Sequence, residues 1–391
     1  MNSFRKLWGS IFPPIHPLPA GVYTFQSPAD ASEQHRLHLR LEPDGRGVLI
    51  VDASTIVHLN PTAAEIAYHM VKSTPEDDAV TQIAGRYNVA KEIVRRDFAE
   101  MVDRLRMLIT TPDLDPVTSF DFDRQDPYSG ATTAPYRIDC ALTYHQPEES
   151  AGHFAPVDRV SRELVTEEWQ QIIDKAWNAG VPHVVFTGGE PTLRPDLCTL
   201  VAYAEKLGMV AGVITNGLRL AESHYLHELL QSGLDHLMLL LDPDEEQSWE
   251  ALRDVLAEDI AVTVHLTLTP HNLPRIDSSL QKLQEMGVPN VSLSAATVEL
   301  KEALQEKRDT SDRLGLRLVW DLPVPYSYFH PVAVELAETL PDVDAVMQGP
   351  GHAWLYVEPD GDVLPGQGYY KKVLGNLFAE RWEDVWAKAS K

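Results

Sequence analysis

The sequence predicts an α/β protein whose main part is a partial (β/α)6-type barrel of parallel strands. An N-terminal winged-helix-like α+β domain and a short C-terminal β-hairpin and helix extension flank this barrel. Three observations support this order. Strand-like and helix-like segments alternate over residues 136–325, three strand-like and then three helix-like segments occupy residues 20–110, and residues 326–391 hold one hairpin signal and one helical pattern.

Composition limits the classes of partner. The chain has 391 residues, of which 44% are hydrophobic and 23% charged, and its net charge is −25. This length allows about two to four domains. The negative charge argues against nucleic acid and anionic membranes, because phosphate groups would be repelled. It is compatible with a basic peptide or a small molecule.

Location is predicted from what the sequence lacks. It contains no apolar run of about 18 residues, which a membrane-spanning helix needs. The N-terminal extension, residues 1–19, has prolines in its apolar stretch and no signal-peptide core. We therefore expect a cytoplasmic protein.

The first domain, residues 20–110, begins with strands. Alternating leucines at 37–41, the turn Asp44-Gly45 and the apolar run 48–51 predict a hairpin, and a third short strand follows at 56–59. Asn60 is a good N-cap for a helix over 61–70. Two more amphipathic helices follow, with Val80, Ile83 and Ala84 on the first, and Val94, Phe98, Met101, Val102, Leu105 and Leu108 on the second. Three strands and three helices form a winged-helix-like unit, for which the acidic charge favours a peptide ligand.

Residues 111–135 are rich in Pro, Asp, Ser and Thr without periodicity, which is typical of a linker. The barrel is predicted at 136–325, with strands at 136–143, 183–187, 210–215, 236–241, 261–268, 291–295 and 316–320. Thr166 is the expected N-cap of the first helix, and Gly180, Gly208 and Gly233 mark helix ends. In the extension, Trp354–Val357, the turn EPDGD and Val363-Leu364 predict a hairpin, and Trp382, Val385 and Trp386 lie on a final helix.

The candidate ligand site lies at the carboxyl ends of three predicted strands, where barrels of this type place their active sites. The first strand ends in Gly188-Gly189-Glu190-Pro191, the next in Thr215-Asn216, and the third in Asp242. The glycines would let a ligand approach backbone amides, and Glu190 would bind an ammonium group. The alternative is an ordinary turn with a solvated Glu190. His265, in mid-strand, is more typical of a hydrogen-bonded core histidine than of a base.

Cysteines and metal ligands are scarce. The two cysteines, Cys140 and Cys198, are too few for a disulfide framework, a four-cysteine zinc site or a conventional iron–sulfur cluster. Nitrogen and oxygen ligands occur in the loop that holds His145, Glu148, Glu149 and His153, but a solvated acidic loop is the favoured interpretation and no metal is predicted. No catalytic residue is assigned.

The order TGGEP, then ITNG, then LDHLMLLLD resembles the radical S-adenosylmethionine superfamily over residues 136–325. The resemblance implies that Gly188, Gly189, Glu190 and Pro191 contact the amino group of S-adenosylmethionine, with Thr215, Asn216 and Asp242 nearby. Residues 326–391 look like a degenerate SPASM or twitch extension.

The first domain is similar to the PqqD-like peptide-recognition domain of ribosomal-peptide maturation, chiefly in VDASTIVHLNPTAAEIAYHM. This resemblance implies a precursor peptide or its leader as partner, added as a strand to the open sheet edge. Residues about 48–60 and the helix at 93–108 would line its groove. The residues proposed for it are Val48, Leu49, Ile50, Val51, Val94, Phe98 and Met101.

The chain departs from the superfamily at its cluster loop. The family pattern is CxxxCxxC after the first strand, but here YRIDCALTY continues as HQPEESAGHF, and Pro365-Gly366-Gln367 stands where the extension often has Pro-Cys. A [4Fe–4S] cluster is therefore predicted to be absent. The expected function is a cluster-free scaffold or accessory factor in peptide maturation, with a maturation enzyme as a further possible partner. Two alternatives stay open: an enzyme that keeps an S-adenosylmethionine or nucleotide pocket for non-radical chemistry such as methyl transfer, and a radical enzyme with a non-standard cluster site whose cysteines come from a partner.

Overall fold

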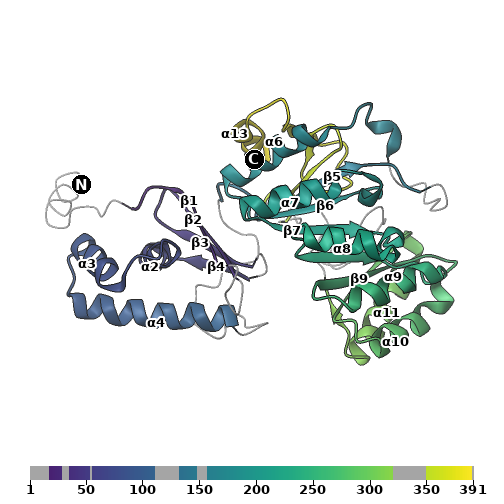
Figure 1. The fold of residues 1–391 in the computed structure, drawn as a ribbon, viewed down its shortest axis with the longest axis horizontal. Helices are drawn as coiled ribbons and strands as arrows, with labels where there is room; N and C mark the ends of the chain where they lie inside the picture. Colours follow the sequence, from purple (N-terminus) through teal and green to yellow (C-terminus); the bar gives the residue numbers. More distant parts are fainter. Residues whose placement is uncertain are drawn as a thin grey trace. The chain divides into compact units, whose positions relative to one another are not determined.

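The structure is a computed structural model that describes residues 17–28, 35–52, 55–110, 132–147, 156–319 and 349–389. The chain forms two compact units, residues 1–126 and 127–391, each with its own hydrophobic core (Figure 1). Most of the predicted linker, residues 111–131, lies outside the described residues, so the domain boundaries stay predictions. No helix among the described residues is long and apolar enough to cross a membrane.

The N-terminal unit is an antiparallel sheet covered by helices. Its strands are β1 (Gly21–Gln26), β2 (Arg36–Leu41), β3 (Gly47–Val51) and β4 (Thr55–Leu59), and they pair in that order. Its helices are α2 (Pro61–Val71), α3 (Glu76–Tyr87) and α4 (Lys91–Thr110). The predicted α+β fold is confirmed. Gly45 has φ +86°, as the turn between β2 and β3 requires, and the Asn60 side chain accepts a hydrogen bond from the Ala63 N–H as expected of an N-cap.

The prediction of three strands was wrong, because β1 adds a fourth. It pairs with β2 from Gly21↔Leu41 to Gln26↔Arg36. The segment GVYTFQ contains the β-branched and aromatic residues that favour strands, so a signal was present in the sequence.

The second unit repeats strand and helix six times, which confirms the predicted partial barrel. The strands are β5 (Arg137–Thr143), β6 (His183–Gly188), β7 (Val210–Thr215), β8 (His236–Leu240), β9 (Ala261–Leu268), β10 (Asn290–Ala295) and β11 (Arg317–Leu318). The helices that follow β5 to β10 are α6 (Thr166–Ala179), α7 (Leu197–Leu207), α8 (Ser223–Gln231), α9 (Glu246–Leu256), α10 (Ile276–Glu285) and α11 (Lys301–Arg313). Neighbouring strands from β5 to β11 are parallel.

The two faces of this sheet differ in chemistry. Alternate residues such as Ile138, Phe186 and Val213 pack with the helices in the large core. The opposite face carries a small apolar group, Val185, Ile214 and Met238 with Leu240, and a polar layer. Within that layer the Nε2 atoms of His183 and His236 are 2.7 Å apart. Gly212 lies on β7, between β6, which holds His183, and β8, which holds His236. A Cβ at Gly212 would lie 2.0 Å from Cε1 of His236, so the histidine pair requires glycine at this position.

The C-terminal extension forms the predicted hairpin and helix, β12 (Trp354–Val357), β13 (Asp362–Leu364) and α13 (Trp382–Ala389), with a short β14 (Gly375–Asn376). Its position was not predicted. β12 pairs in parallel with β5, from Trp354↔Arg137 to Val357↔Cys140, and so extends the main sheet. Lys175 of α6 fixes the extension further, since its Nζ donates to the carbonyls of Leu377, Phe378 and Glu380 at 2.6, 3.1 and 2.9 Å.

Two helix-end predictions differ in outcome. Gly180 ends α6 with φ +96°, as predicted. Thr166 is the first residue of α6 and not its N-cap, which is Val165. The Thr166 hydroxyl instead donates to Asp196 Oδ2 at 2.6 Å, which links α6 to the residue before α7.

Candidate functional site at the strand ends

The two glycines of TGGEP lie against the chain's own backbone. The Gly189 N–H donates to the Thr143 carbonyl at 2.6 Å, and the Glu190 N–H donates to the His145 carbonyl at 2.8 Å. A Cβ at Gly188 or Gly189 would stand 2.1 Å from the Thr143 or His145 oxygen. The glycines therefore let the segment after β5 run beside the end of β6.

Glu190 joins the ends of β6 and β7. Its side chain is buried, and Oε1 accepts hydrogen bonds from Thr192 N (3.0 Å), Thr192 Oγ1 (2.7 Å) and Thr215 Oγ1 (2.6 Å). Its Oε2 accepts one from Asn216 N at 2.8 Å. Burial raises the pKa of this carboxyl, and the hydrogen bonds oppose the rise. The structure thus brings together Glu190, Thr215 and Asn216 as the sequence predicted, but with the carboxylate engaged inside the protein.

The other predicted residues lie around this junction. Pro191 begins the 3-10 turn Pro191–Leu193. Asp242 is exposed in the turn after β8, where its N–H donates to Ser248 Oγ at 3.2 Å and its Oδ1 accepts from Asp244 N at 2.9 Å. No contact between Asp242 and Glu190 is found within the described residues.

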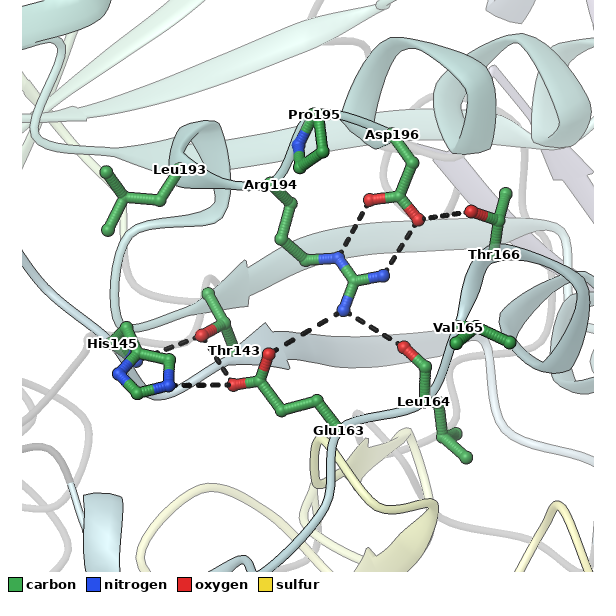
Figure 2. A pocket seen from close by; sticks show the side chains of 10 residues that line it. All are labelled: Thr143, His145, Glu163, Leu164, Val165, Thr166, Leu193, Arg194, Pro195 and Asp196. Atoms are coloured by element: carbon green, nitrogen blue, oxygen red, sulfur yellow. Dashed lines mark hydrogen bonds and ion pairs between the residues drawn. The ribbon is translucent and has the colours of Figure 1, made fainter.

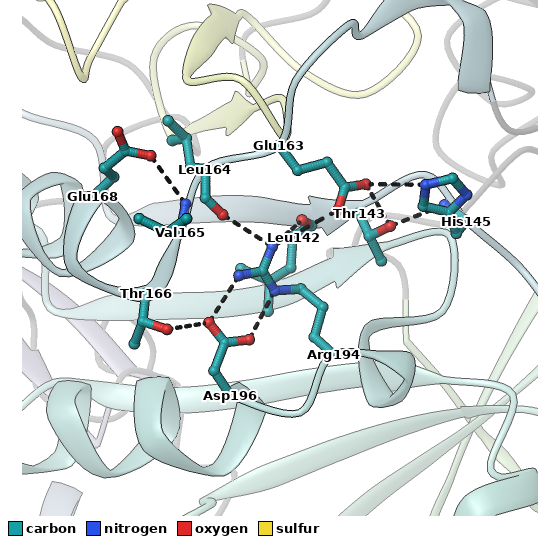
Figure 3. A network of polar contacts seen from close by, with 10 residues as sticks. All are labelled: Leu142, Thr143, His145, Glu163, Leu164, Val165, Thr166, Glu168, Arg194 and Asp196. Atoms are coloured by element: carbon teal, nitrogen blue, oxygen red, sulfur yellow. Dashed lines mark hydrogen bonds and ion pairs between the residues drawn. The ribbon is translucent and has the colours of Figure 1, made fainter.

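A network centred on Arg194 connects β5, α6 and α7 (Figure 3). Its guanidinium forms a two-point ion pair with Asp196, at 2.9 Å from Nε and 2.7 Å from Nη2. Its Nη1 donates to the carbonyls of Leu142 (3.2 Å) and Leu164 (3.0 Å). Arg194 therefore holds three chain segments in register at this end of the sheet.

A cavity of about 470 Å³ lies beside this network (Figure 2). Its lining residues come from the β5 end, the segment before α6 and the loop between β6 and α7: Thr143, His145, Glu163, Leu164, Val165, Thr166, Leu193, Arg194, Pro195 and Asp196. In this cavity Thr143 Oγ1 donates to Glu163 Oε1 at 2.6 Å. The sequence prediction missed Glu163, Arg194 and Asp196, although TLRPDL directly after TGGEP places a basic and an acidic residue at a strand end.

A second polar group joins the β5 end to the extension. Glu358 is buried and accepts hydrogen bonds from Tyr144 Oη (2.9 Å), Arg159 Nε (2.6 Å) and Arg159 Nη2 (2.8 Å). Nearby, Tyr144 and Tyr356 pack with Ala141 and Leu364, and Val160, Tyr369 and Tyr370 pack against them. Aromatic side chains thus cover the sheet face opposite the helices at the ends of β5 and β12.

The thiols do not fit a cluster that needs three thiolates. Cys140 is fully buried in the core between sheet and helices, where burial raises the pKa of its thiol. Cys198 lies on α7, partly buried, and burial raises its thiol pKa too. Within the described residues no group of three or more His, Cys, Asp or Glu could hold a metal ion. Of the loop residues considered as metal ligands, Glu148, Glu149 and His153 lie outside the described residues.

Most of the residues proposed for peptide binding belong to the N-terminal core, and Val48 and Ile50, which are outside that cluster, are buried as well. β3 pairs with β2 on one side and β4 on the other, so its residues Val48–Val51 cannot receive an added strand. Val94, Phe98 and Met101 of α4 are buried in the same core. Among the described strands, the edges of this sheet are β1 and β4, because a strand with two neighbours has no free backbone edge.

His265 has the surroundings of a core histidine. Its Nδ1 is 3.0 Å from Ser292 Oγ, and its Nε2 is 2.9 Å from Ser294 Oγ and 3.1 Å from Thr267 Oγ1.

The chain thus combines two units. One is a parallel βα sheet in which a strand end carries glycines and a glutamate, and the other is a small antiparallel α+β unit. Residues 140–298 match the model of the radical SAM superfamily, and residues 46–108 match that of coenzyme PQQ synthesis protein D (PqqD). The chain therefore combines a segment that matches the radical SAM superfamily with an N-terminal segment that matches PqqD.

Similar proteins include a PqqA peptide cyclase from Streptomyces rochei, 29% identical over an alignment of 267 residues; the match covers 61% of this chain and 71% of that protein. The fold is similar to Streptococcus suis SuiB bound to S-adenosylmethionine, with a TM-score of 0.57, 16% identity and coverage of 90% of this chain and 86% of SuiB. SuiB bound to its precursor peptide SuiA gives a TM-score of 0.58, with 14% identity and coverage of 89% and 86%.

Proposed function

We propose that this protein binds a ribosomally made precursor peptide, or its leader, and serves peptide maturation as a scaffold or accessory factor without a [4Fe–4S] cluster. The peptide would add a strand to β4. Support comes from the PqqD-like match, from the relatives that act on or bind peptides, and from the open edge of the N-terminal sheet.

The observation that carries the peptide-binding part is the edge position of β4. Within the residues the structure describes, β4 pairs with β3 alone, and it lies inside the PqqD-like match. β1 is the other edge strand, but it lies before residue 46, where that match begins. The side chains of Val57 and Leu59 point into the core, so a peptide at this edge would be held mainly by backbone hydrogen bonds.

The cluster-free part rests on the thiols of this chain. Three thiolates are needed, two cysteines are present in the whole sequence, and Cys140 is enclosed among apolar side chains. When bound, such a cluster would supply the electron for reductive cleavage of S-adenosylmethionine.

Hydrogen–deuterium exchange on the full chain tests peptide binding, with the short peptide encoded beside this gene as the probe. We expect the peptide to slow amide exchange in β4 at least tenfold and to leave β1 unchanged, because an added strand would pair with the free backbone groups of β4. A scrambled peptide of the same composition is the control. Unchanged exchange in β4 at saturating peptide would refute the edge assignment.

Iron content tests the cluster-free part. After anaerobic reconstitution with iron and sulfide, we expect no stoichiometric iron and no 5′-deoxyadenosine from S-adenosylmethionine. A known cluster protein treated in parallel is the control. Stoichiometric iron and sulfide together with 5′-deoxyadenosine release would contradict the proposal and support a radical enzyme with a non-standard cluster site.

A second candidate function is an enzyme that keeps an S-adenosylmethionine pocket for polar chemistry. Thr187, which precedes Gly188, favours it, because its hydroxyl is buried and has no hydrogen-bond partner within the described part of the chain. A ligand would form a hydrogen bond with this hydroxyl and would also donate to Glu190 Oε2, which accepts a single hydrogen bond from the described residues. Calorimetric titration with S-adenosylmethionine, on the native chain and on Thr187→Val, decides between scaffold and enzyme: binding that Thr187→Val weakens supports the enzyme, and no heat of binding supports the scaffold.

A further inference from the structure

The cavity beside Arg194 has a polar floor and an apolar rim. At the rim, Val165 and Leu193 are 52% and 46% exposed, which places them among the most exposed large apolar side chains in the described residues. The floor contains Glu163 and Asp196, with Arg194 between them. A ligand here would contact apolar surface along its length and charge at its end.

Arg194 is directed toward the protein and not toward a ligand. Its Nε and Nη2 are paired with Asp196, and its Nη1 donates to two backbone carbonyls. The guanidinium therefore has little capacity left for an anion, and a carboxylate or phosphate in the cavity would meet Glu163 and Asp196 as like charges.

Glu163 presents to the cavity a carboxylate oxygen that accepts no hydrogen bond from the described residues. Its Oε1 accepts from Thr143 Oγ1 at 2.6 Å, and the His145 ring lies 3.8 Å from the same oxygen. Its Oε2 makes an ion pair with Arg194 Nη1 at 3.8 Å, which is too long for a hydrogen bond. The side chain is 31% exposed, so Oε2 is open to a donor that enters the cavity.

A single open carboxylate oxygen selects among cations. A guanidinium binds best to two oxygens of one carboxylate, but Oε1 is occupied by Thr143. An ammonium is a compact charge that binds well to one oxygen, and the four-carbon stem of lysine would lie against the apolar rim on one side of Arg194, at Val165 or at Leu193 (Figure 2). The chain's net charge of −25 also favours a cationic ligand.

We propose that this cavity is a subsite for a lysine side chain of the bound peptide, with Glu163 as the ammonium acceptor and one side of the apolar rim, Val165 or Leu193, as the contact for the stem. This rests on the proposed peptide-binding function, but it concerns the βα unit and not the β4 edge.

Methyl NMR on the full chain tests the subsite, with N-acetyl-lysine amide as the probe. We expect its titration to shift the methyl signals of Val165 or of Leu193, whichever side of the rim contacts the stem. N-acetyl-norleucine amide, which has the stem without the ammonium, should bind about tenfold more weakly, because a hydrogen bond to a charged group is lost. Absence of shifts with the lysine probe up to its solubility would overturn the proposal, as would equal affinity for the norleucine probe.

Two variants locate the acceptor. Glu163→Gln keeps an oxygen for Thr143 and removes the charge, so we expect about tenfold weaker lysine binding with unchanged unfolding. Glu167→Gln, an exposed neighbour outside the cavity, is the matched control and should bind like the native chain. Unaltered affinity in Glu163→Gln would overturn the role of Glu163. Because the lysine probe does not engage β4, its result is independent of the exchange experiment on the precursor peptide.

Discussion

Glu190 is the residue whose role differs most between its sequence motif and its surroundings. The motif suggests an exposed carboxylate that waits for an ammonium group, whereas the structure shows a buried carboxylate with four hydrogen bonds from Thr192, Thr215 and Asn216. Such a residue stabilises the strand ends whether or not a ligand binds. TGGEP and TNG therefore have a structural role that does not depend on the reaction of a bound ligand.

Replacing Glu190 with Gln tests this structural role. The glutamine side chain has one oxygen that accepts hydrogen bonds. Its nitrogen would therefore face either the N–H of Asn216 or the donors of Thr192 and Thr215. We expect the free energy of unfolding to fall by about 1–3 kcal/mol in urea denaturation. Glu258→Gln, at an exposed site, is the control. A Glu190→Gln protein as stable as the native chain would show that the carboxylate serves only a ligand.

The histidine pair predicts how stability depends on pH. Burial is the main cause that lowers the pKa of His236 to about 4, and it lowers that of His183 as well, with the facing ring and Arg137 acting in the same direction. Above pH of about 6.5 both folded and unfolded chains carry neutral histidines, so the pair has no effect. As the pH falls from about 6.5 to 4, the unfolded chain takes up protons that the folded chain refuses, and stability decreases.

We expect His236 to reduce the free energy of unfolding by up to about 3 kcal/mol at pH near 4, and His183 to act in the same direction. Denaturation of the native chain between pH 7.5 and 4.5 measures the slope. His236→Gln should flatten it, whereas His224→Gln, an exposed control, should not. An identical slope in His236→Gln would mean that other groups cause the pH dependence.

At the scale of elements, the strands and helices of the barrel could be predicted because each has a strong local pattern. Predicted strands at 183–187, 210–215 and 261–268 correspond to β6, β7 and β9 within one residue at each end. β1 was missed although Tyr23 and Phe25 alternate with the polar Thr24 and Gln26, so the sequence did carry a signal for it. The pairing of β12 with β5 joins segments more than 200 positions apart, and no local pattern specifies such a neighbour.

The approach of the β5 end to TGGEP gives a prediction at this scale. A methyl group at Gly189 would stand 2.1 Å from the His145 oxygen, so Gly189→Ala must separate these two segments. We expect a loss of about 3 kcal/mol in the free energy of unfolding. Gly85→Ala is the opposite case, because nothing lies within 4 Å of its added Cβ and Gly85 lies within α3. It should gain about 0.5–1 kcal/mol. Equal stability of the two variants would contradict the close contact at Gly189.

At the scale of the whole molecule, the fold class of each of the two units was predicted from the sequence, but the candidate site around Arg194 was not. That site depends on three segments, Thr143–His145, Glu163–Thr166 and Leu193–Asp196, which meet only after the sheet has formed. The motif residues at the strand ends were found because each stands in a recognisable local sequence. Glu163 stands in no such local sequence, and Asp196 stands only in TLRPDL, directly after TGGEP.

Two separate cores predict two separate unfolding events. Leu59 packs only in the core of the N-terminal unit and Leu200 only in that of the second unit. In calorimetry we expect two transitions, with Leu59→Ala lowering the midpoint of one and Leu200→Ala that of the other, each by a destabilisation of about 2–5 kcal/mol. If either substitution moved both transitions, the units would unfold together.

The place of β12 in the main sheet also determines when folding can finish. β5 lacks its neighbour on that side until residues near 356 have been synthesised, although β6 on the other side follows within about 40 residues. At a translation rate of about 5–20 residues per second, this strand edge stays open for about 10 s or more on the ribosome. A nascent chain of this protein is thus most prone to aggregation after its parallel strands have formed and before its last hairpin emerges.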